Sequence, residues 1–216
     1  PPRSTLFPYT TLFRSEDGYQ AQRSYSLLSP PQRTGLYELG IERLDDGEVS
    51  TWFHDKAQHG ETIEVLGPVG GHFVLDESNT RPALLIGGGS GVVPLLSMAA
   101  QRVGAYSQAH TTLLVAARHL DEVLLWPTLQ RWEAFTPRFR SRLALSRDTC
   151  APRAQDHVGR IDGADVAWAL QQLGDVATES AQVFICGRND FVESIVHMVT
   201  GLNVPEVSIR TERFGS

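Results

Sequence analysis

Glycines gather between Gly87 and Gly91, directly after the apolar run at 83–86 and before a stretch of helical character at 91–103. A strand, a glycine turn and a helix in this order can hold a pyrophosphate, because glycine lets the backbone approach closely and the helix N-terminus supplies N–H groups. The spacing departs from G-x-G-x-x-G, since Pro94 stands where the third glycine would be. A purely structural strand-to-helix turn is the alternative. No Lys-Ser/Thr pair follows, which disfavours a P-loop kinase or ATPase.

A second candidate segment is RSYS, within a predicted strand at 20–29. The alternation of a strand puts Arg23 and Tyr25 on one face, and Ser24 and Ser26 on the other. One face then offers a guanidinium for a phosphate and an aromatic plane for a flat ligand. An ordinary exposed Arg/Tyr pair is the alternative.

A third segment, GEVS, runs from Gly47 to Ser50 and begins a predicted short helix at 49–57. Its N–H groups could meet a phosphate, and the alternative is that Ser50 is an N-cap. Cys186 ends a predicted strand at 182–186, where a cysteine either contacts a ligand or packs in the core.

The elements that must position these residues follow two patterns. Residues 16–75 contain short strands, predicted at 20–29, 35–44 and 61–66, separated by turns, as in part of an antiparallel barrel. From about residue 80, apolar strands alternate with helices, which predicts a doubly wound parallel sheet. The strands are expected at 83–86, 111–117, 140–146, 182–186 and 207–212, and the helices at 91–103, 124–135, 163–172 and 190–201. The polar stretch 76–81 marks the boundary.

Composition excludes several classes of protein. Of the 216 residues, 41% are hydrophobic and 20% charged, which is typical of a globular chain. Acids outnumber bases, 25 to 19, so we expect no nucleic-acid partner, and no apolar run approaches the roughly 18 residues of a membrane span. The two cysteines are too few for an iron–sulfur cluster, which takes about four, and the histidines show no metal-binding spacing.

Residues 1–15 differ from the rest of the chain, because they contain no acid, no alanine and no glycine. The string PPRSTLFPYTTLFRS is identical to the translation of a sequencing adapter. We therefore expect a non-native segment that is irregular or opportunistically paired, and a truncated gene behind it.

The order of the motifs resembles the ferredoxin–NADP reductase superfamily, especially bacterial stand-alone reductases and the reductase components of oxygenase systems. The resemblance covers 16–216 except for the family's first barrel strands. It rests on RSYS, GEVS, GPVGGHFVL at 67–75, LLIGGGSGVVPLLSM from residue 84, VFICGRNDFVESI at 183–195 and IRTERFG at 209–215. It implies an incomplete FAD-binding barrel domain at 16–78 and an NAD(P)-binding domain at 79–216.

The resemblance also implies roles for single residues. Arg23 would bind the FAD pyrophosphate, Tyr25 would pack against the flavin, and Ser26 would hydrogen-bond near flavin N5. Cys186 and Gly187 would lie beside the nicotinamide, and Glu212 and Phe214 would return to the flavin. The positions matching the two phosphate-binding turns are Gly47, Val49 and Ser50, and Gly87, Gly88, Gly89, Gly91 and Pro94. Arg210 stands where the family usually has histidine.

The implied activity is hydride transfer from NAD(P)H to FAD, followed by electron delivery to a separate acceptor such as ferredoxin or an oxygenase component. NADPH is expected as the donor in preference to NADH, because Arg118 and Arg147 at corresponding strand ends could bracket a 2′-phosphate. The alternative is that both arginines are simply solvated. A flavin reductase that uses free flavin, or a non-catalytic electron-transfer or nucleotide-sensing subunit, remains an alternative. A cytoplasmic location and no metal are expected.

Overall fold

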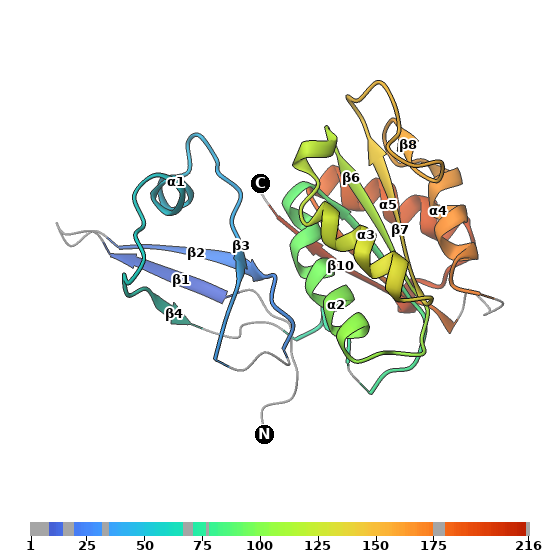
Figure 1. Ribbon diagram of the computed structural model, residues 1–216, viewed down its shortest axis with the longest axis horizontal. Coiled ribbons are helices and arrows are strands. Elements are labelled where there is room, and N and C mark those ends of the chain that lie inside the picture. The colour runs from blue at the N-terminus through green and yellow to red at the C-terminus, as the bar shows by residue number, and fades with distance from the viewer. Residues whose placement is uncertain are drawn as a thin grey trace.

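The computed structural model describes residues 9–14, 20–31, 35–66, 71–76, 78–174 and 180–214. These residues form a small antiparallel sheet followed by a larger parallel sheet covered with helices (Figure 1). The predicted fold class, a partial antiparallel barrel followed by a doubly wound parallel sheet, is confirmed.

The small sheet has the strand order β3-β2-β1-β4. Its strands are β1 (Tyr9–Arg14), β2 (Gln20–Leu27), β3 (Leu39–Gly40) and β4 (Glu64–Leu66). All neighbours are antiparallel, and β1 pairs on both sides, with β2 and with β4. The described part of the 1–15 segment is therefore paired. Helix α1 (Glu48–Asp55) lies beside this sheet, away from the other helices (Figure 1).

The strand predicted at 35–44 is wrong in extent, since only Leu39 and Gly40 pair with β2. Leu28 N still donates to Glu38 O, but Pro30 and Pro31 follow in the partner strand and carry no N–H to continue the ladder. The strand predicted at 61–66 is also shorter, because only its last three residues form β4.

The large sheet has the order β10-β9-β5-β6-β7-β8, and all its pairs are parallel. Its strands are β5 (Ala83–Gly88), β6 (Thr111–Ala117), β7 (Phe139–Leu145), β8 (His157–Val158), β9 (Gln182–Gly187) and β10 (Ile209–Arg213). The sequence pattern did not indicate the two-residue β8, which extends the edge beside β7.

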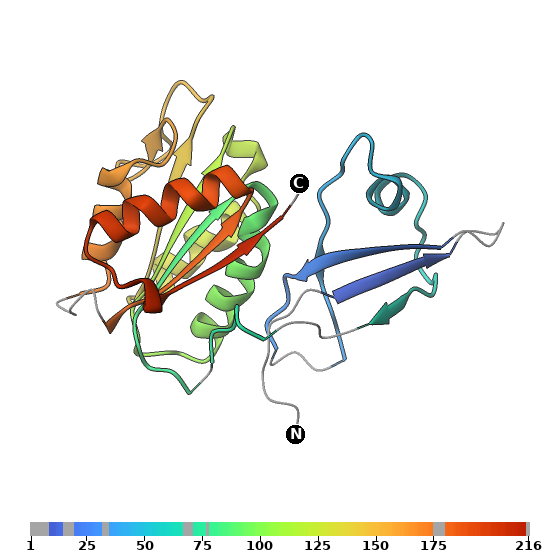
Figure 2. The same cartoon turned by 180° about the vertical axis from the view of Figure 1, so that it is seen from behind.

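Helices cover both faces of this sheet (Figures 1 and 2). They are α2 (Val92–Gly104), α3 (Trp126–Phe135), α4 (Gly163–Gln171) and α5 (Asn189–Gly201). Leu85 joins a core cluster with side chains of α2 and α3, whereas Leu84 and Ile86 join one with α4 and α5. The run ALLI is apolar throughout because both faces of β5 are buried.

The two sheets meet through α2. Ser97 Oγ, buried on this helix, donates a hydrogen bond of 2.7 Å to Ser29 O, two residues after the end of β2. A Cβ built on Gly40 would lie 2.4 Å from a methyl carbon of Val93, so the backbone of β3 packs directly on α2. Within the described part of the chain, no helix has both the length and the apolar content needed to cross a membrane.

Candidate functional site

The glycine segment forms the predicted strand–turn–helix unit. Strand β5 ends at Gly88, a 3-10 turn spans Gly89–Gly91, and α2 begins at Val92. A Cβ on Gly91 would lie 2.5 Å from Cys186 O, so only glycine lets this turn approach the end of β9. Gly89 is exposed, has φ +56 and faces open space, which leaves its backbone accessible to a ligand.

The remaining loop positions are packed. A Cβ on Gly87 would meet the α2 backbone 2.8 Å away, and Gly88 and Gly187 both lie against the ring of Phe191. Pro94 is buried in the first turn of α2, where the missing N–H needs no helical partner.

The topology of the sheet indicates the edge at which a ligand would bind. Strand β5 lies between β6 and β9, and α2 after β5 covers one face of the sheet while α5 after β9 covers the other. Loops that leave neighbouring strands toward opposite faces open a gap at the carboxyl edge, where nucleotides bind in doubly wound sheets. The glycine turn lies at this edge, directly after β5.

The residues predicted to contact the nicotinamide meet at the same edge. Cys186 pairs with Gly87 on one side and with Glu212 on the other. Phe214 is the residue after the end of β10, and its N–H donates to Gly187 O at 3.0 Å. The Phe214 side chain packs against the core cluster that includes Cys186. In Figures 1 and 2 the carboxyl end of β10 points toward the small sheet.

Burial favours the protonated forms of Cys186 and Glu212. Burial, and then the neighbouring Glu212 carboxylate, raise the pKa of the Cys186 thiol far above its ordinary value. Burial also raises the pKa of Glu212, while the nearby His72 charge acts in the opposite direction. The cysteine is therefore a protonated thiol, and its side chain has no exposed surface, as the packing alternative requires. Arg210 donates to Gln182 Oε1 at 3.2 Å and lies over the Phe184 ring.

On the small sheet, Tyr25 of β2 contacts α1. Its half-buried ring meets Phe53 edge-to-face, with centroids 5.8 Å apart, and Trp52 packs on Phe53 in turn. Burial raises the pKa of Tyr25, and the nearby charge of exposed Arg23 partly offsets this. The Tyr25–Phe53 contact brings the RSYS and GEVS segments together, and the sequence pattern did not indicate Phe53.

Two features fit a bound flavin nucleotide. Ser26 Oγ is buried and has no hydrogen-bond partner among the described residues, so it can bond to a polar edge of a ligand. The first turn of α1 begins after Gly47, and no side chain caps the N-terminus of this helix. This open N-terminus suits a phosphate.

The alternative reading of Ser50 as an N-cap is wrong, because it is the third residue of α1. Its Oγ donates to Gly47 O at 3.0 Å and accepts from Leu44 N at 3.2 Å. A Cβ on Gly47 would lie 2.3 Å from that Oγ. Val49 is buried and anchors the helix.

Arg118 and Arg147 are neighbours at the carboxyl ends of β6 and β7, where Arg147 N donates to Arg118 O at 2.9 Å. The structure places an acid, Glu122, against this pair. Arg118 Nη2 lies 2.9 Å from Glu122 Oε1, and its Nε and backbone N donate to Glu122 Oε2. A 2′-phosphate would have to compete with this carboxylate.

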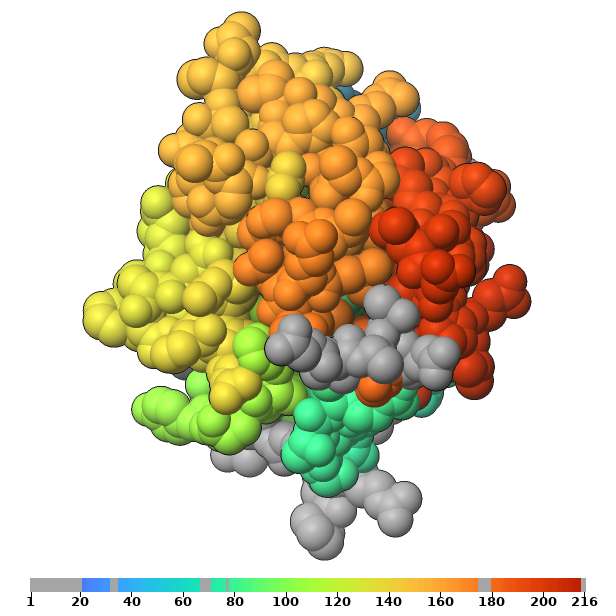
Figure 3. Space-filling view, turned by 90° about the vertical axis from the view of Figure 1, so that its right-hand side faces the viewer, coloured from blue at the N-terminus to red at the C-terminus, as the bar shows by residue number. Residues whose placement is uncertain are grey.

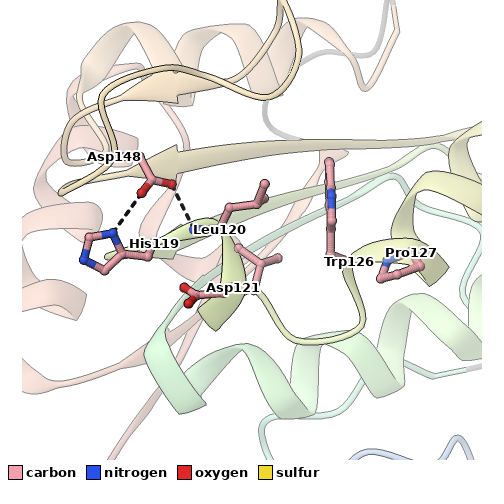
Figure 4. Close-up of a pocket in the computed structure, with 7 residues that line it drawn as sticks. His119, Leu120, Asp121, Trp126, Pro127 and Asp148 are labelled. Atoms are coloured by element: carbon pink, nitrogen blue, oxygen red, sulfur yellow. Dashed lines mark hydrogen bonds and ion pairs between the residues drawn. The ribbon is translucent and has the colours of Figure 1, made fainter.

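A shallow hollow of about 590 Å³ lies beside these arginines, and sequence reasoning missed it (Figure 4). Asp148 bridges its wall, accepting from Leu120 N at 2.9 Å and contacting His119 Nδ1 at 2.8 Å. The Trp126 ring forms another wall and lies under the Arg153 guanidinium, 4.5 Å away. These residues come from a 3-10 turn, the start of α3 and the segment after β7, and no common sequence period joins them.

Among the residues that the structure describes, His157, Asp162 and Asp165 form a histidine–carboxylate group with metal-ligand proximity. Protein groups already engage it. Asp165 contacts Arg142 Nη2 at 2.8 Å and His157 Nδ1 at 2.7 Å, and Asp162 caps α4. The structure therefore gives these side chains a structural role.

Comparisons with known proteins cover both sheets. The family model "Oxidoreductase FAD-binding domain" matches residues 9–74, and "Oxidoreductase NAD-binding domain" matches residues 85–197, more than half of the chain. Fold and site thus define an oxidoreductase with an FAD-binding and an NAD(P)-binding part. The chain belongs to the ferredoxin–NADP reductase superfamily.

Relatives within this family differ in length. Ferredoxin–NADP reductase B of Sorangium cellulosum is 29% identical over 199 residues, which is 91% of this chain and 80% of that protein. The flavohemoprotein of Bacillus subtilis is 29% identical over 200 residues, or 91% of this chain. The chain spans 47% of that flavohemoprotein's length.

Solved structures share the fold. The Amycolatopsis cytochrome P450 reductase GcoB superposes with a TM-score of 0.80 at 23% identity, covering 99% of this chain and 62% of that one. A ferredoxin NADP+ reductase from Neisseria gonorrhoeae, with bound FAD and NADP, superposes with a TM-score of 0.74 at 20% identity. That match covers 99% of this chain and 89% of that one.

Proposed function

We propose that this chain transfers a hydride from NAD(P)H to FAD and passes the electrons to a separate acceptor protein. The observation that carries the proposal is the register at the carboxyl edge, where Gly87, Cys186 and Glu212 lie side by side on three adjacent strands. A nucleotide seated on the glycine turn would place its reactive ring at this edge. FAD, when bound, supplies the redox chemistry, accepting electrons in pairs and releasing them singly.

The small sheet would hold the flavin nucleotide. Arg23 is exposed and offers a guanidinium to the pyrophosphate, and the open N-terminus of α1 offers N–H groups to the same anion. Tyr25, fixed by Phe53, offers a flat wall for the ring. Ser26 Oγ would gain the hydrogen bond that it lacks within the described chain.

The large sheet would position the nicotinamide. Cys186 and Gly187 would lie beneath the ring at the end of β9, where Phe214 from the end of β10 now packs over them. Burial favours the protonated carboxyl of Glu212, which can hold a proton close to the reacting rings. Phe214 would exclude water and set the stacking distance.

The acceptor would be a ferredoxin or an oxygenase component. The two cysteines of the chain do not suffice for an iron–sulfur cluster of its own. Similar proteins include a reductase subunit of glycine betaine monooxygenase from Pseudomonas aeruginosa, which is 23% identical over 96% of this chain and 55% of its own length. The ferredoxin reductase in carbazole 1,9a-dioxygenase shares the fold.

Flavin retention tests the proposal. Arg23→Ala removes a charge-assisted contact worth roughly 1.5–3 kcal/mol, so the dissociation constant for FAD should rise about ten- to a hundredfold. Arg43→Ala is the matched control, because it removes an exposed arginine near α1 whose guanidinium is held by Asp45 and Asp55. Flavin absorbance after gel filtration measures retention.

Three results contradict the proposal. Equal FAD retention in Arg23→Ala and wild type removes the flavin assignment. Absence of NAD(P)H oxidation with an artificial acceptor, in flavin-loaded protein, favours a non-catalytic subunit. Turnover that saturates only with added free FAD favours a flavin reductase.

A further inference from the structure

One face of α2 holds the small sheet at two points. Val93 and Ser97 lie one helical turn apart, so their side chains project from the same face of the helix. Val93 packs against the backbone of Gly40 in β3, and Ser97 Oγ donates to Ser29 O at 2.7 Å. Val93, Ser97 and Ser29 are all buried. The contact between the two sheets therefore contains a directional bond as well as close packing.

The two points are also joined to each other within the small sheet. Ser29 N donates to Glu38 O at 3.4 Å, and Ser29 Oγ accepts from Glu38 N at 3.1 Å. Glu38 directly precedes β3, the strand that contains Gly40. The carbonyl that Ser97 holds and the glycine that packs on α2 thus belong to one hydrogen-bonded unit, and neither can move along the helix alone.

The same helix and the same strand carry the two expected binding segments. Helix α2 begins directly after the glycine turn Gly89–Gly91, where the nucleotide is expected. Strand β2 contains the RSYS segment, where the flavin is expected, and it ends at Leu27, two residues before Ser29. The hydrogen bond from Ser97 to Ser29 is therefore a short link between the nucleotide turn and the flavin strand.

We propose that Ser97 is a positioning residue for hydride transfer, an inference that rests on the function proposed above. By holding Ser29, it fixes β2 on α2, and so it sets the distance between a ring on the small sheet and a nicotinamide at the carboxyl edge. Reacting atoms must lie about 3–3.5 Å apart, and a displacement of roughly 1 Å can slow such a reaction about a hundredfold. Ser97 acts through β2 and α2, because its side chain is completely buried between them and the core.

The first test removes the hydroxyl. Ser97→Ala takes from Ser29 O its donor on α2 but leaves the packing of β3 in place. The limiting rate of flavin reduction by NAD(P)H should fall about tenfold, because the reacting rings are held less closely. The FAD content and the dissociation constant of NAD(P)H should stay as in the wild type. Anaerobic stopped-flow absorbance separates the limiting rate from the dissociation constant.

Ser141→Ala is the matched control. Ser141 is as completely buried as Ser97, but it lies on β7, and its Oγ accepts a hydrogen bond from Arg153 Nη1 at 3.3 Å. This variant also loses one buried hydroxyl and one hydrogen bond, so it measures the effect of lost stability alone. Its limiting rate of flavin reduction should equal that of the wild type.

The second attachment point allows a test with its own rescue. Gly40→Ala adds a methyl group that would overlap a methyl carbon of Val93, so it should displace β3 on α2 and slow flavin reduction. Combining Gly40→Ala with Val93→Ala removes the obstructing methyl groups and should restore most of the rate. Two independent losses of stability would add in the double variant, whereas a corrected position cancels them.

Electron paramagnetic resonance measures the position of the sheets without turnover. One spin label is attached to the native Cys150, which is exposed in the loop between β7 and β8, at the top of Figure 3. The other is attached to Lys56→Cys, at the exposed end of α1. Ser97→Ala should broaden the distribution of distances between the labels, and Ser141→Ala should leave it unchanged.

The outcomes separate this proposal from the proposed function. Wild-type protein that takes up no flavin, or whose bound flavin NAD(P)H does not reduce, overturns both. If the wild type is active and Ser97→Ala reduces its flavin equally fast, only the positioning role is overturned.

Three further results also overturn the positioning role. The first is an equal loss of rate in Ser97→Ala and Ser141→Ala, which indicates a general loss of stability. The second is an unchanged distribution of label distances in Ser97→Ala. The third is loss of FAD from Ser97→Ala, which assigns the contact to flavin retention.

Discussion

Cys186 and Glu212 lie directly opposite each other in the parallel pairing of β9 and β10. The two residues are separated by 25 residues along the chain, and only the pairing of the two strands brings the thiol and the carboxyl together. Burial raises the pKa of both groups, and the carboxylate raises the pKa of the thiol further. The pair is therefore poised toward its fully protonated form.

The two cysteines should differ in reactivity toward iodoacetamide. Cys150 is exposed, whereas Cys186 is buried with a strongly raised pKa, and only thiolates alkylate rapidly. Native protein should label at Cys150 alone, and denatured protein at both sites. Mass spectrometry locates the label. Rapid labelling of native Cys150→Ser would show that Cys186 is accessible.

Glu212 should make stability depend on pH. The pKa of Glu212 in the folded state lies above its value in the unfolded chain. Its contribution to the free energy of unfolding is therefore zero at low pH, and it becomes destabilising as the pH rises from the unfolded pKa to the folded pKa. Glu212→Gln removes this penalty, so its Tm advantage over wild type should be larger near pH 8 than near pH 4 by a few degrees. Thermal unfolding at both pH values measures this.

The nearby charge of His72 acts against burial and lowers the pKa of Glu212. A Tm difference between Glu212→Gln and wild type that stays constant across the pH range would contradict the assigned burial.

Gly91→Ala should destabilise the nucleotide loop. The new methyl would lie 2.5 Å from Cys186 O and 2.7 Å from Gly187 Cα, and backbone atoms there cannot rotate away. A cost of about 1–3 kcal/mol and weaker NAD(P)H binding are expected. Gly104→Ala, at the end of α2, meets nothing within 4 Å and should leave stability unchanged or slightly raised. Unfolding in denaturant measures the free energy of unfolding of both variants. Similar values would refute the close approach of Gly91 to Cys186 O.

Arg118 and Glu122 should set the preference between NADPH and NADH. If Arg118 binds a 2′-phosphate, Arg118→Ala should lower kcat/KM for NADPH about tenfold or more and affect NADH little. Glu122→Gln removes the competing charge and should raise kcat/KM for NADPH. Arg147→Ala tests the second expected phosphate contact. An NADH preference that Arg118→Ala leaves unchanged would reject the predicted donor.

The large sheet was predictable because its interior strands are buried on both faces. ALLI and VFIC read as continuous apolar runs, and the helices between them show clear periodicity. The small sheet was less predictable, because the length of each strand depends on how far its partner strand can pair with it. Residues 35–44 alternate correctly, yet the ladder stops where prolines interrupt the strand beside them.

For the site, the carboxyl-edge residues could be placed from the sequence because the ends of parallel strands share one edge. The contacts that could not be anticipated join elements without a common period. Phe53 meets Tyr25 across a helix and a strand, and Glu122 folds back on Arg118 through a 3-10 turn. Tertiary packing of this kind leaves no repeat in the local sequence.

The seating of β3 on α2 limits how relatives can be recombined. Gly40 admits the methyl groups of Val93 only because it has no side chain, and the carbonyl of Ser29 accepts from Ser97 on the same helix. A chimera that joins the small sheet of this chain to the large sheet of a relative would inherit one half of each contact. Such hybrids should fold well when Gly40, Val93, Ser29 and Ser97 are all kept. Any exchange that puts a larger residue opposite Val93 should push the two sheets apart.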